Sequence, residues 1–162
     1  MSPTRACLVG LFVATLGAAR PAGAQSAPLD SASRAKIVAF AEDAAVRALR
    51  FTKGDLASLR AGEADFTSAG RVAFVKQMDG YLDGNGAPAF TSAFTPAGKP
   101  VVIGETNGIV HIKIPGVLVQ SSGGSRTTYR VAVEVDAGGA PPKIVRLAQT
   151  TCVGAAARNY CM

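Results

Sequence analysis

The chain has 162 residues, of which 48% are hydrophobic and 17% charged, and its 17 lysines and arginines outnumber its 11 acidic residues. This length favours one domain with a core of its own, and the low charge excludes a chain that is disordered throughout. The sequence contains no apolar run of the roughly 18 residues expected for a transmembrane helix. It has no tryptophan and few other aromatic residues, so the sequence offers few side chains on which bases or sugars could stack.

The first 24 residues have the layout of a secretory signal peptide. Arg5 gives a positive start, residues 6–19 are apolar, and Ala22-Gly23-Ala24 places small residues at a cleavage site. We expect cleavage after Ala24, export to the periplasm and a loose leader over residues 25–32. The alternative is that the apolar stretch is retained as a membrane anchor, although it is short for one.

Cleavage would remove Arg5 and Arg20 and lower the net charge from +6 to +4. The remaining lysines and arginines are scattered, so no basic cluster predicts nucleic-acid binding. We interpret the surplus as solvated side chains with a mild attraction for anionic partners or lipid headgroups. Contact with a membrane would then be peripheral unless the signal is uncleaved.

Cleavage would also remove Cys7 and leave Cys152 and Cys161 as a pair in an oxidising compartment. A disulfide between them would close a loop of about ten residues, contribute about 2–3 kcal/mol, and hold the C-terminal tail on the last strand. A redox pair is the alternative, but redox pairs favour C-x-x-C spacing at the start of a helix. We therefore predict a structural disulfide.

The folded domain is expected to span residues 33–162 and to begin with helices. The first is capped by Ser31 or Ser33 and runs to about Arg50, and a short turn capped by Asp55 follows. Apolar residues at helical spacing predict its buried face: Ile37, Phe40, Ala41, Ala44, Ala48 and Leu49.

A further helix is predicted from Thr67 or Ser68 to about Leu82, where Gly84-Asn85-Gly86 ends it. Its expected buried face has Phe74 at the flank and follows a three-four spacing: Val72, Val75, Met78 and Leu82.

The rest of the chain is typical of strands joined by short turns. Residues 101–106 and 109–114 flank Asn107-Gly108, a strong hairpin signal, and the second strand continues beyond a kink at Pro115-Gly116. Apolar residues alternate with polar ones over 127–136, which predicts a half-buried strand.

A last strand is expected from Lys143 to about Thr151. Strands connected by such short turns must be antiparallel, because parallel crossovers need a dozen or more residues. We therefore predict an α+β domain in which a curved antiparallel sheet packs on the N-terminal helices.

Short motifs along residues 35–150 are similar to those of a known family. They are the helix that starts at Ile37, the segment from Asp65 to Gly70 with Phe74 four residues on, the strand from Pro100, and the sequence Ile112-Lys113-Ile114-Pro115. In this order they resemble the IcmL/DotI/TraM family of type IV secretion and conjugation proteins, in which the segment before Phe74 corresponds to an F-T-x-x-G motif. The resemblance implies a cone-shaped, nuclear transport factor 2-like fold.

The resemblance also implies a function. Members of that family are bitopic inner-membrane proteins whose periplasmic domain assembles with other components of the secretion channel, and they are not enzymes. This sequence departs from them at its start, where a short signal with a cleavage site stands in place of a transmembrane helix. We therefore expect a free periplasmic domain.

The same cone fold also hosts isomerases and dehydratases, so the residues must decide between binding and catalysis. His111 is the one histidine, and Glu105 lies across the Asn107-Gly108 turn, from where it could approach His111 or Lys113. An exposed cross-strand pair is the simpler interpretation. An arrangement of aspartate and tyrosine stays open as well, from Asp79, Tyr81 or Tyr129, although the spacing does not favour it.

Other chemical motifs are missing or out of context. One histidine cannot supply an H-E-x-x-H motif or a Cys₂His₂ set, so a zinc site is not expected. Gly84-x-Gly86-x-x-Ala89 follows a helix, where a dinucleotide motif would follow a strand. Asp83-Gly84-Asn85-Gly86 lacks the ligand spacing of a calcium loop. We predict no catalytic, cofactor-binding or metal site.

These observations predict a non-enzymatic periplasmic protein-interaction module, an IcmL/DotI-like accessory component of a type IV secretion or conjugation system. Its partners would be proteins of the secretion complex or further copies of itself. Docking would use an exposed sheet face or strand addition at an unpaired edge. The alternative is a periplasmic small-molecule-binding protein, or an isomerase or lyase, that uses the cavity of the cone.

Overall fold

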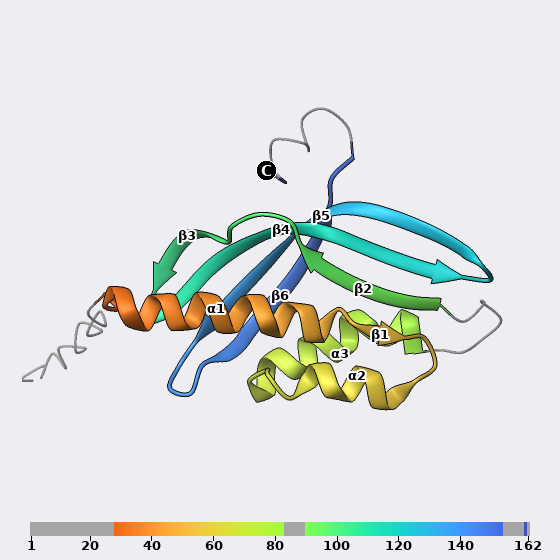
Figure 1. Ribbon diagram of the computed structural model, residues 1–162. Helices are drawn as coiled ribbons and strands as arrows, with labels where there is room; N and C mark the ends of the chain where they lie inside the picture. The colour runs from red at the N-terminus through yellow and green to blue at the C-terminus, as the bar shows by residue number, and fades with distance from the viewer. Residues whose placement is uncertain (1–27, 83–89, 154–160, 162) are drawn as a thin grey trace, which may run out of the picture.

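The computed structural model describes residues 28–82, 90–153 and 161. Within these residues the helices are α1 (Ser31–Ala48), α2 (Leu56–Glu63) and α3 (Ser68–Leu82). The strands are β1 (Phe51–Thr52), β2 (Phe90–Pro96), β3 (Val101–Thr106), β4 (Ile109–Ser122), β5 (Ser125–Gly138) and β6 (Lys143–Thr151). A curved antiparallel sheet lies over the helices, which are all on one side of it (Figure 1). The predicted α+β class with its curled sheet is confirmed.

Helix α1 begins at an aspartate. The side chain of Asp30 accepts hydrogen bonds from the backbone N–H and the hydroxyl of Ser33, at 2.8 and 2.7 Å. The serine cap predicted from the sequence is therefore wrong by one to three residues, and Ser33 is the donor to the cap. The predicted inner face is confirmed apart from Phe40, which is half-buried, and most of it is alanine, so α1 lies close to the sheet.

The turn after Asp55 is longer than predicted. Asp55 accepts from the backbone N–H groups of Ala57 and Ser58, and a helix of two turns follows. Helix α3 starts where predicted, because the hydroxyl of Thr67 accepts from the N–H of Gly70. Its predicted buried face is confirmed at Met78 and wrong at Val72, which is 67% exposed, and Phe74, expected at the flank, is buried.

The sheet is built around one long strand. Along one edge β4 pairs with β5 over its whole length, and along the other it pairs first with β3 and then with β2. The β3–β4 hairpin turns at Asn107-Gly108 as predicted, with Asn107 and Gly108 both at positive φ. Strand β2 is an element that the sequence analysis missed, and it joins β4 to β1.

Strand alternation sends one side of the sheet into the core. The inward residues of β4 and β5 are fully buried between sheet and helices: Val110, Ile112, Ile114, Val131, Val133 and Val135. Strand β4 runs through Pro115-Gly116 without a break, and a side chain at Gly116 would collide with the ring of Phe94. The absence of a side chain at Gly116 leaves room for Phe94 of the neighbouring strand β2.

Several sequence predictions fall partly or wholly outside the described residues. They are the signal peptide over residues 1–24, most of the leader over 25–32, the helix stop at Gly84-Asn85-Gly86, and the side chains of Asp79, Tyr81 and Leu82. Helix α1 begins at Ser31, two residues before the predicted start of the domain. None of the helices in residues 28–82 is both long and apolar enough to cross a membrane.

Candidate functional site

Strand β3 forms an open edge of the sheet. It pairs with β4 on one side, and no other described strand pairs with its second side. Figure 1 shows β3 at the rim of the sheet, above the start of α1. A strand edge of this kind presents unpaired backbone N–H and C=O groups, which another extended chain can pair with.

The open edge carries three consecutive exposed apolar residues. Val101, Val102 and Ile103 have 44%, 40% and 56% of their surface exposed. Two successive strand residues normally face opposite sides, so exposure of all three shows that β3 extends beyond the helices and core on both faces. The register shift between Val102 and Gly104 adds Ile103 as an extra residue on this strand.

One end of β3 is fixed to α1 by Glu105. Its carboxylate accepts the backbone N–H of Leu29 at 2.7 Å and two guanidinium N–H groups of Arg34 at 3.0 and 2.8 Å. The hydrogen bond from Leu29, followed by that from Arg34, lowers the pKa of Glu105. The carboxylate therefore stays ionised and keeps β3 attached to the helix.

This placement corrects the predicted approach of Glu105 to His111 or Lys113. Glu105 lies opposite Val110 and faces α1, whereas Gly104 lies opposite His111. A carboxylate does pair with the histidine, but it comes from the next strand. Nδ1 of His111 and Oδ1 of Asp136 are 2.8 Å apart, because the two residues are register partners on β4 and β5.

The histidine belongs to a charged network on the outer face of the sheet. Nε of Arg146 donates to the second oxygen of Asp136 at 2.7 Å, and its terminal N–H reaches Glu134 at 3.4 Å. Partial burial raises the pKa of Asp136, but the hydrogen bonds from Arg146 and His111 outweigh it and lower that pKa overall. Both carboxylate oxygens of Asp136 have partners, so Asp136 links His111 on β4 to Arg146 on β6 as a cross-strand clamp.

The second candidate site is a cavity of about 200 Å³ between the sheet and the helices. It is bounded by the end of α1, by α3, and by strands β1, β2, β4 and β6. Its lining joins apolar residues to one serine and three glutamines: Leu49, Phe51, Phe74, Gln77, Met78, Ser92, Leu118, Gln120, Leu147 and Gln149. No acidic or basic side chain is among these residues.

Ser92 is the polar residue that the fold buries inside this cavity. Only 3% of its surface is exposed, and its hydroxyl has no hydrogen-bond partner among the described residues. A cavity in the cone was expected from the sequence, but Ser92 and the other lining residues were not found, because β2 itself was missed. The alternation of Phe90, Ser92 and Phe94 is the signal that could have found them.

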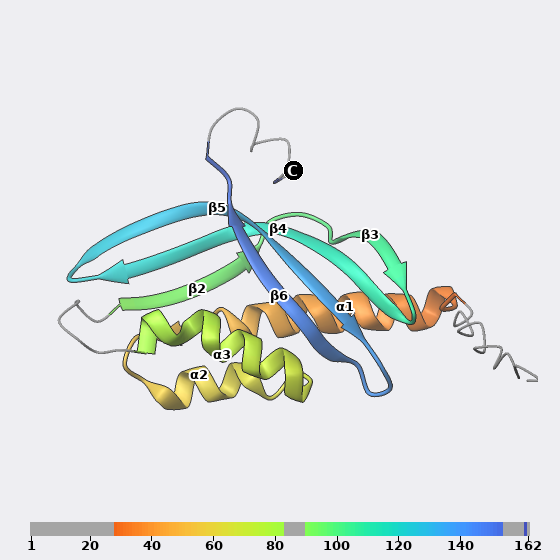
Figure 2. The same cartoon turned by 180° about the vertical axis from the view of Figure 1, so that it is seen from behind.

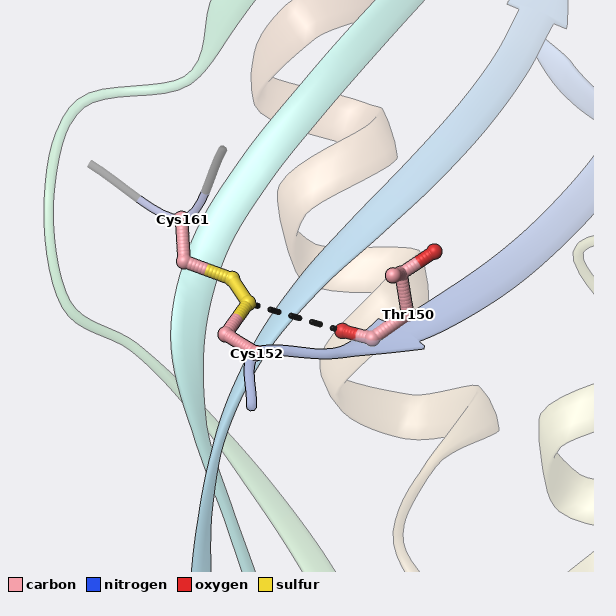
Figure 3. Close-up of a disulfide and its surroundings, with 3 residues drawn as sticks. All are labelled: Thr150, Cys152 and Cys161. Atoms are coloured by element: carbon pink, nitrogen blue, oxygen red, sulfur yellow. Dashed lines mark hydrogen bonds between the residues drawn. A yellow bond between two sulfur atoms is a disulfide. The ribbon is translucent and has the colours of Figure 1, made fainter. Parts of the chain in front are cut away.

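The predicted pair of cysteines is joined. A disulfide links Cys152, directly after β6, to Cys161, with the Cα atoms 6.3 Å apart (Figure 3). The backbone N–H of Cys152 donates to the carbonyl of Arg130 on β5 at 2.9 Å, so the bridge begins from a residue fixed to the sheet. Within the described residues no three His, Cys, Asp or Glu side chains form a group that could hold a metal ion.

No protein-family model matches the sequence, and none of the curated proteins matches it significantly. Two solved structures have a similar fold. One is an IcmL-like type IV secretion system protein from Legionella pneumophila, with a TM-score of 0.63 and 14% identity, over 80% of this chain and 98% of that chain. The other is the periplasmic domain of DotI, with a TM-score of 0.59 and 16% identity, over 77% of this chain and 98% of that chain. The likeness is one of fold, and it confirms the resemblance predicted from the sequence.

Proposed function

We propose that this protein is a non-enzymatic interaction module of the periplasm and an accessory component of a type IV secretion or conjugation apparatus. The likeness to two type IV secretion structures supports the class of machine. A disulfide joins Cys152 and Cys161, and one of the two similar structures is a periplasmic domain, which supports the compartment. Cleavage after Ala24 would release residues 25–162 as a free domain.

The exposed apolar edge of β3 carries the proposal of docking. An extended apolar segment of another secretion protein would pair with the unpaired backbone of β3, while its side chains cover Val101, Val102 and Ile103. Burial of apolar surface would supply most of the free energy, and the backbone hydrogen bonds would fix the register. The attachment of Glu105 to α1 keeps the edge extended before a partner arrives.

A role without catalysis agrees with the chemistry of the cavity and of the charged network on the outer face of the sheet. An isomerase or lyase needs an acid or base beside its substrate, and the described lining of the cavity has neither. On the outer face, both carboxylate oxygens of Asp136 are engaged, one with Nδ1 of His111 and the other with Nε of Arg146, so Asp136 is not a free base.

Site-specific photo-crosslinking in the native host tests the docking edge. A benzophenone amino acid replaces Val102 on β3, and the matched control replaces Val72, an equally apolar and more exposed residue on α3. We expect a crosslink to a component of the secretion apparatus from position 102 and none from position 72. If crosslinks form only between copies of this chain, then β3 is the interface of a homodimer and not a docking site for another secretion protein. Equal crosslinking from both positions, or none, would contradict docking at β3.

Purification of the protein from the native host tests whether it is exported and cleaved. A tag placed in the leader after Ala24 recovers the protein, and mass spectrometry reports its first residue. We expect the mature chain to start at Gln25. An intact N-terminus with secretion partners attached would show that residues 6–19 are a retained anchor. A protein recovered alone would argue against the secretion role.

A further inference from the structure

We infer that the interior cavity is a binding site for one small uncharged molecule, about the size of a single ring, with Ser92 as its polar anchor. This inference does not rest on the secretion role, because the cavity and the β3 edge share no residue. It rests on the burial of Ser92, on the register that surrounds it and on the composition of the cavity lining.

Ser92 is the first observation. Buried hydroxyl groups are nearly always hydrogen-bonded, since an unpaired one has lost its water without replacement. Ser92 is one of the residues that line the cavity, and its hydroxyl is shielded from solvent and has no partner among the described residues. Alanine would fill the same position without that cost. A molecule in the cavity that hydrogen-bonds to the hydroxyl would remove this energetic cost.

The register of the sheet surrounds Ser92 with complementary groups. Phe51 on β1, Ser92 on β2 and Gln120 on β4 are direct partners across three neighbouring strands, so their side chains lie in one row on the inner face. A ring resting on Phe51 could therefore reach the hydroxyl of Ser92 and the amide of Gln120 together. Both groups donate and accept hydrogen bonds.

The lining defines the class of ligand. It has no charged side chain, so an ion would lose its hydration without compensation, and the site selects an uncharged molecule. The walls formed by Phe74, Met78 and Leu118 favour an apolar body. A cavity of about 150 Å³ holds benzene, so 200 Å³ admits one substituted ring and excludes a peptide or an acyl chain.

The cavity also has an entrance. Its floor is formed by buried residues, whereas Gln77 is exposed and Gln120 and Gln149 are half-buried. The three amides therefore lie at the rim, where the cavity meets solvent. A small molecule could enter between them without unfolding the sheet, and an amide at the rim could bond to a polar group that points outward.

Water is the competing occupant, and binding of a neutral ring tests the difference. We would titrate the mature protein with 2-piperidone, an uncharged six-membered lactam, and follow the ¹³C-labelled ε-methyl of Met78, which lies in the cavity wall. Cyclohexanecarboxylate is the charged probe of similar size. We expect the chemical shift of the Met78 methyl to change saturably with the lactam, with a dissociation constant of about 1–10 mM, as fits a ligand of seven non-hydrogen atoms. Binding of the carboxylate should be at least about tenfold weaker.

Ser92→Ala tests the anchor. It removes the hydroxyl and keeps the strand, and we expect the lactam to bind about tenfold more weakly. Thr95→Ala is the matched control, since it removes an exposed hydroxyl from the outer side of the same strand. Its dissociation constant should equal that of the unaltered protein. Thermal unfolding without ligand should show Ser92→Ala to be at least as stable, which excludes misfolding as the cause.

Three results would overturn the inference. If no probe moves the Met78 signal in a saturable way, the cavity holds water only. If the lactam binds Ser92→Ala as tightly as the unaltered protein, the hydroxyl is not the anchor. If the carboxylate binds as well as the lactam, the site does not select an uncharged ligand.

Discussion

Two of the outer strands of the sheet, β6 and β3, differ in whether their free edges are covered. The first half of β6 is covered by chain: the N–H of Thr67 donates to the carbonyl of Ile144, and the N–H of Ile144 donates to the carbonyl of Asp65, both at 2.8 Å. Figure 2 shows α3 beside this strand. Strand β3 has no such cover, and its exposed side chains are apolar. Proteins usually cover or charge their edges, so an open apolar edge indicates a place for a partner.

The close contact between α3 and β6 at the covered edge depends on a single glycine. A Cβ atom on Gly70 of α3 would lie 2.7 Å from the carbonyl oxygen of Val145 and 2.8 Å from that of Ile144. Backbone oxygens in a sheet cannot move aside, so any side chain here would push α3 away from β6. The stacked rings of Phe66 and Phe74, 4.6 Å apart, fill the space beside this contact.

The largest predicted effect comes from opening the covered edge. Gly70→Ala should destabilise the protein by about 2–3 kcal/mol, because overpacking against a rigid neighbour costs that much. Helix propensity alone predicts the opposite sign, a gain of about 1 kcal/mol from alanine. Urea unfolding measures the free energy, and Ala69→Gly on the same turn is the control for propensity. A stabilised Gly70→Ala variant would show that α3 is not held against β6.

Sequence reasoning located the strands better than their surroundings. The alternating valines of β5 and the Asn107-Gly108 turn are local signals, and both elements formed where predicted. The inner face of α3 was predicted correctly at Met78 and wrongly at Val72, because apolar spacing favours a large residue such as valine, whereas the contact with β6 is made at Gly70. Which face turns inward depends on packing between distant segments.

The candidate sites depended still more on distant contacts. Val101, Val102 and Ile103 predicted a strand, but their exposure follows from the topology that leaves β3 outside. Strand β2 was not predicted because threonine, serine and alanine dilute its apolar pattern, and Ser92 in the cavity lining was missed with it. The pairing of His111 with Asp136 required the register of β4 and β5, which sequence spacing alone did not supply.

Two arginines on α1 form ion pairs beside the two edges, Arg47 beside the covered edge at β6 and Arg34 beside the open edge at β3. Arg47 donates once, to Asp65 beside the covered edge at 2.7 Å, whereas Arg34 donates twice to Glu105 of the open strand and once to the carbonyl of Leu29. Arg47→Met should cost less than about 0.5 kcal/mol, since a single exposed ion pair contributes little. Arg34→Met should cost more than Arg47→Met in the same urea experiment. The reverse order would show that β3 needs no attachment to α1.

The attachment of β3 should also depend on pH. The pKa of Glu105 lies below its ordinary value of 4.5, so its contribution is present above that value and is lost as the pH falls through the lowered pKa. The unaltered protein should therefore have a higher Tm than Glu105→Gln at pH 7, and the difference should shrink by pH 3. A difference that stays constant with pH would exclude the ionised carboxylate as the cause.

The smallest effect on stability is predicted for the residue with the largest effect on docking. Ile103 is 56% exposed and lies at the register shift of β3, so Ile103→Lys removes little packing and should change the free energy of unfolding by less than about 0.5 kcal/mol. A lysine at an open edge opposes pairing with another strand, because its charge would have to be desolvated. Crosslinking from position 102 should therefore be lost in a protein that unfolds normally. Val72→Lys is the control and should change neither the free energy of unfolding nor the crosslinking from position 102.

If Ile103→Lys unfolds the domain, then β3 contributes to the core and its edge is not a free surface. If both folding and crosslinking persist, the partner contacts another part of the sheet.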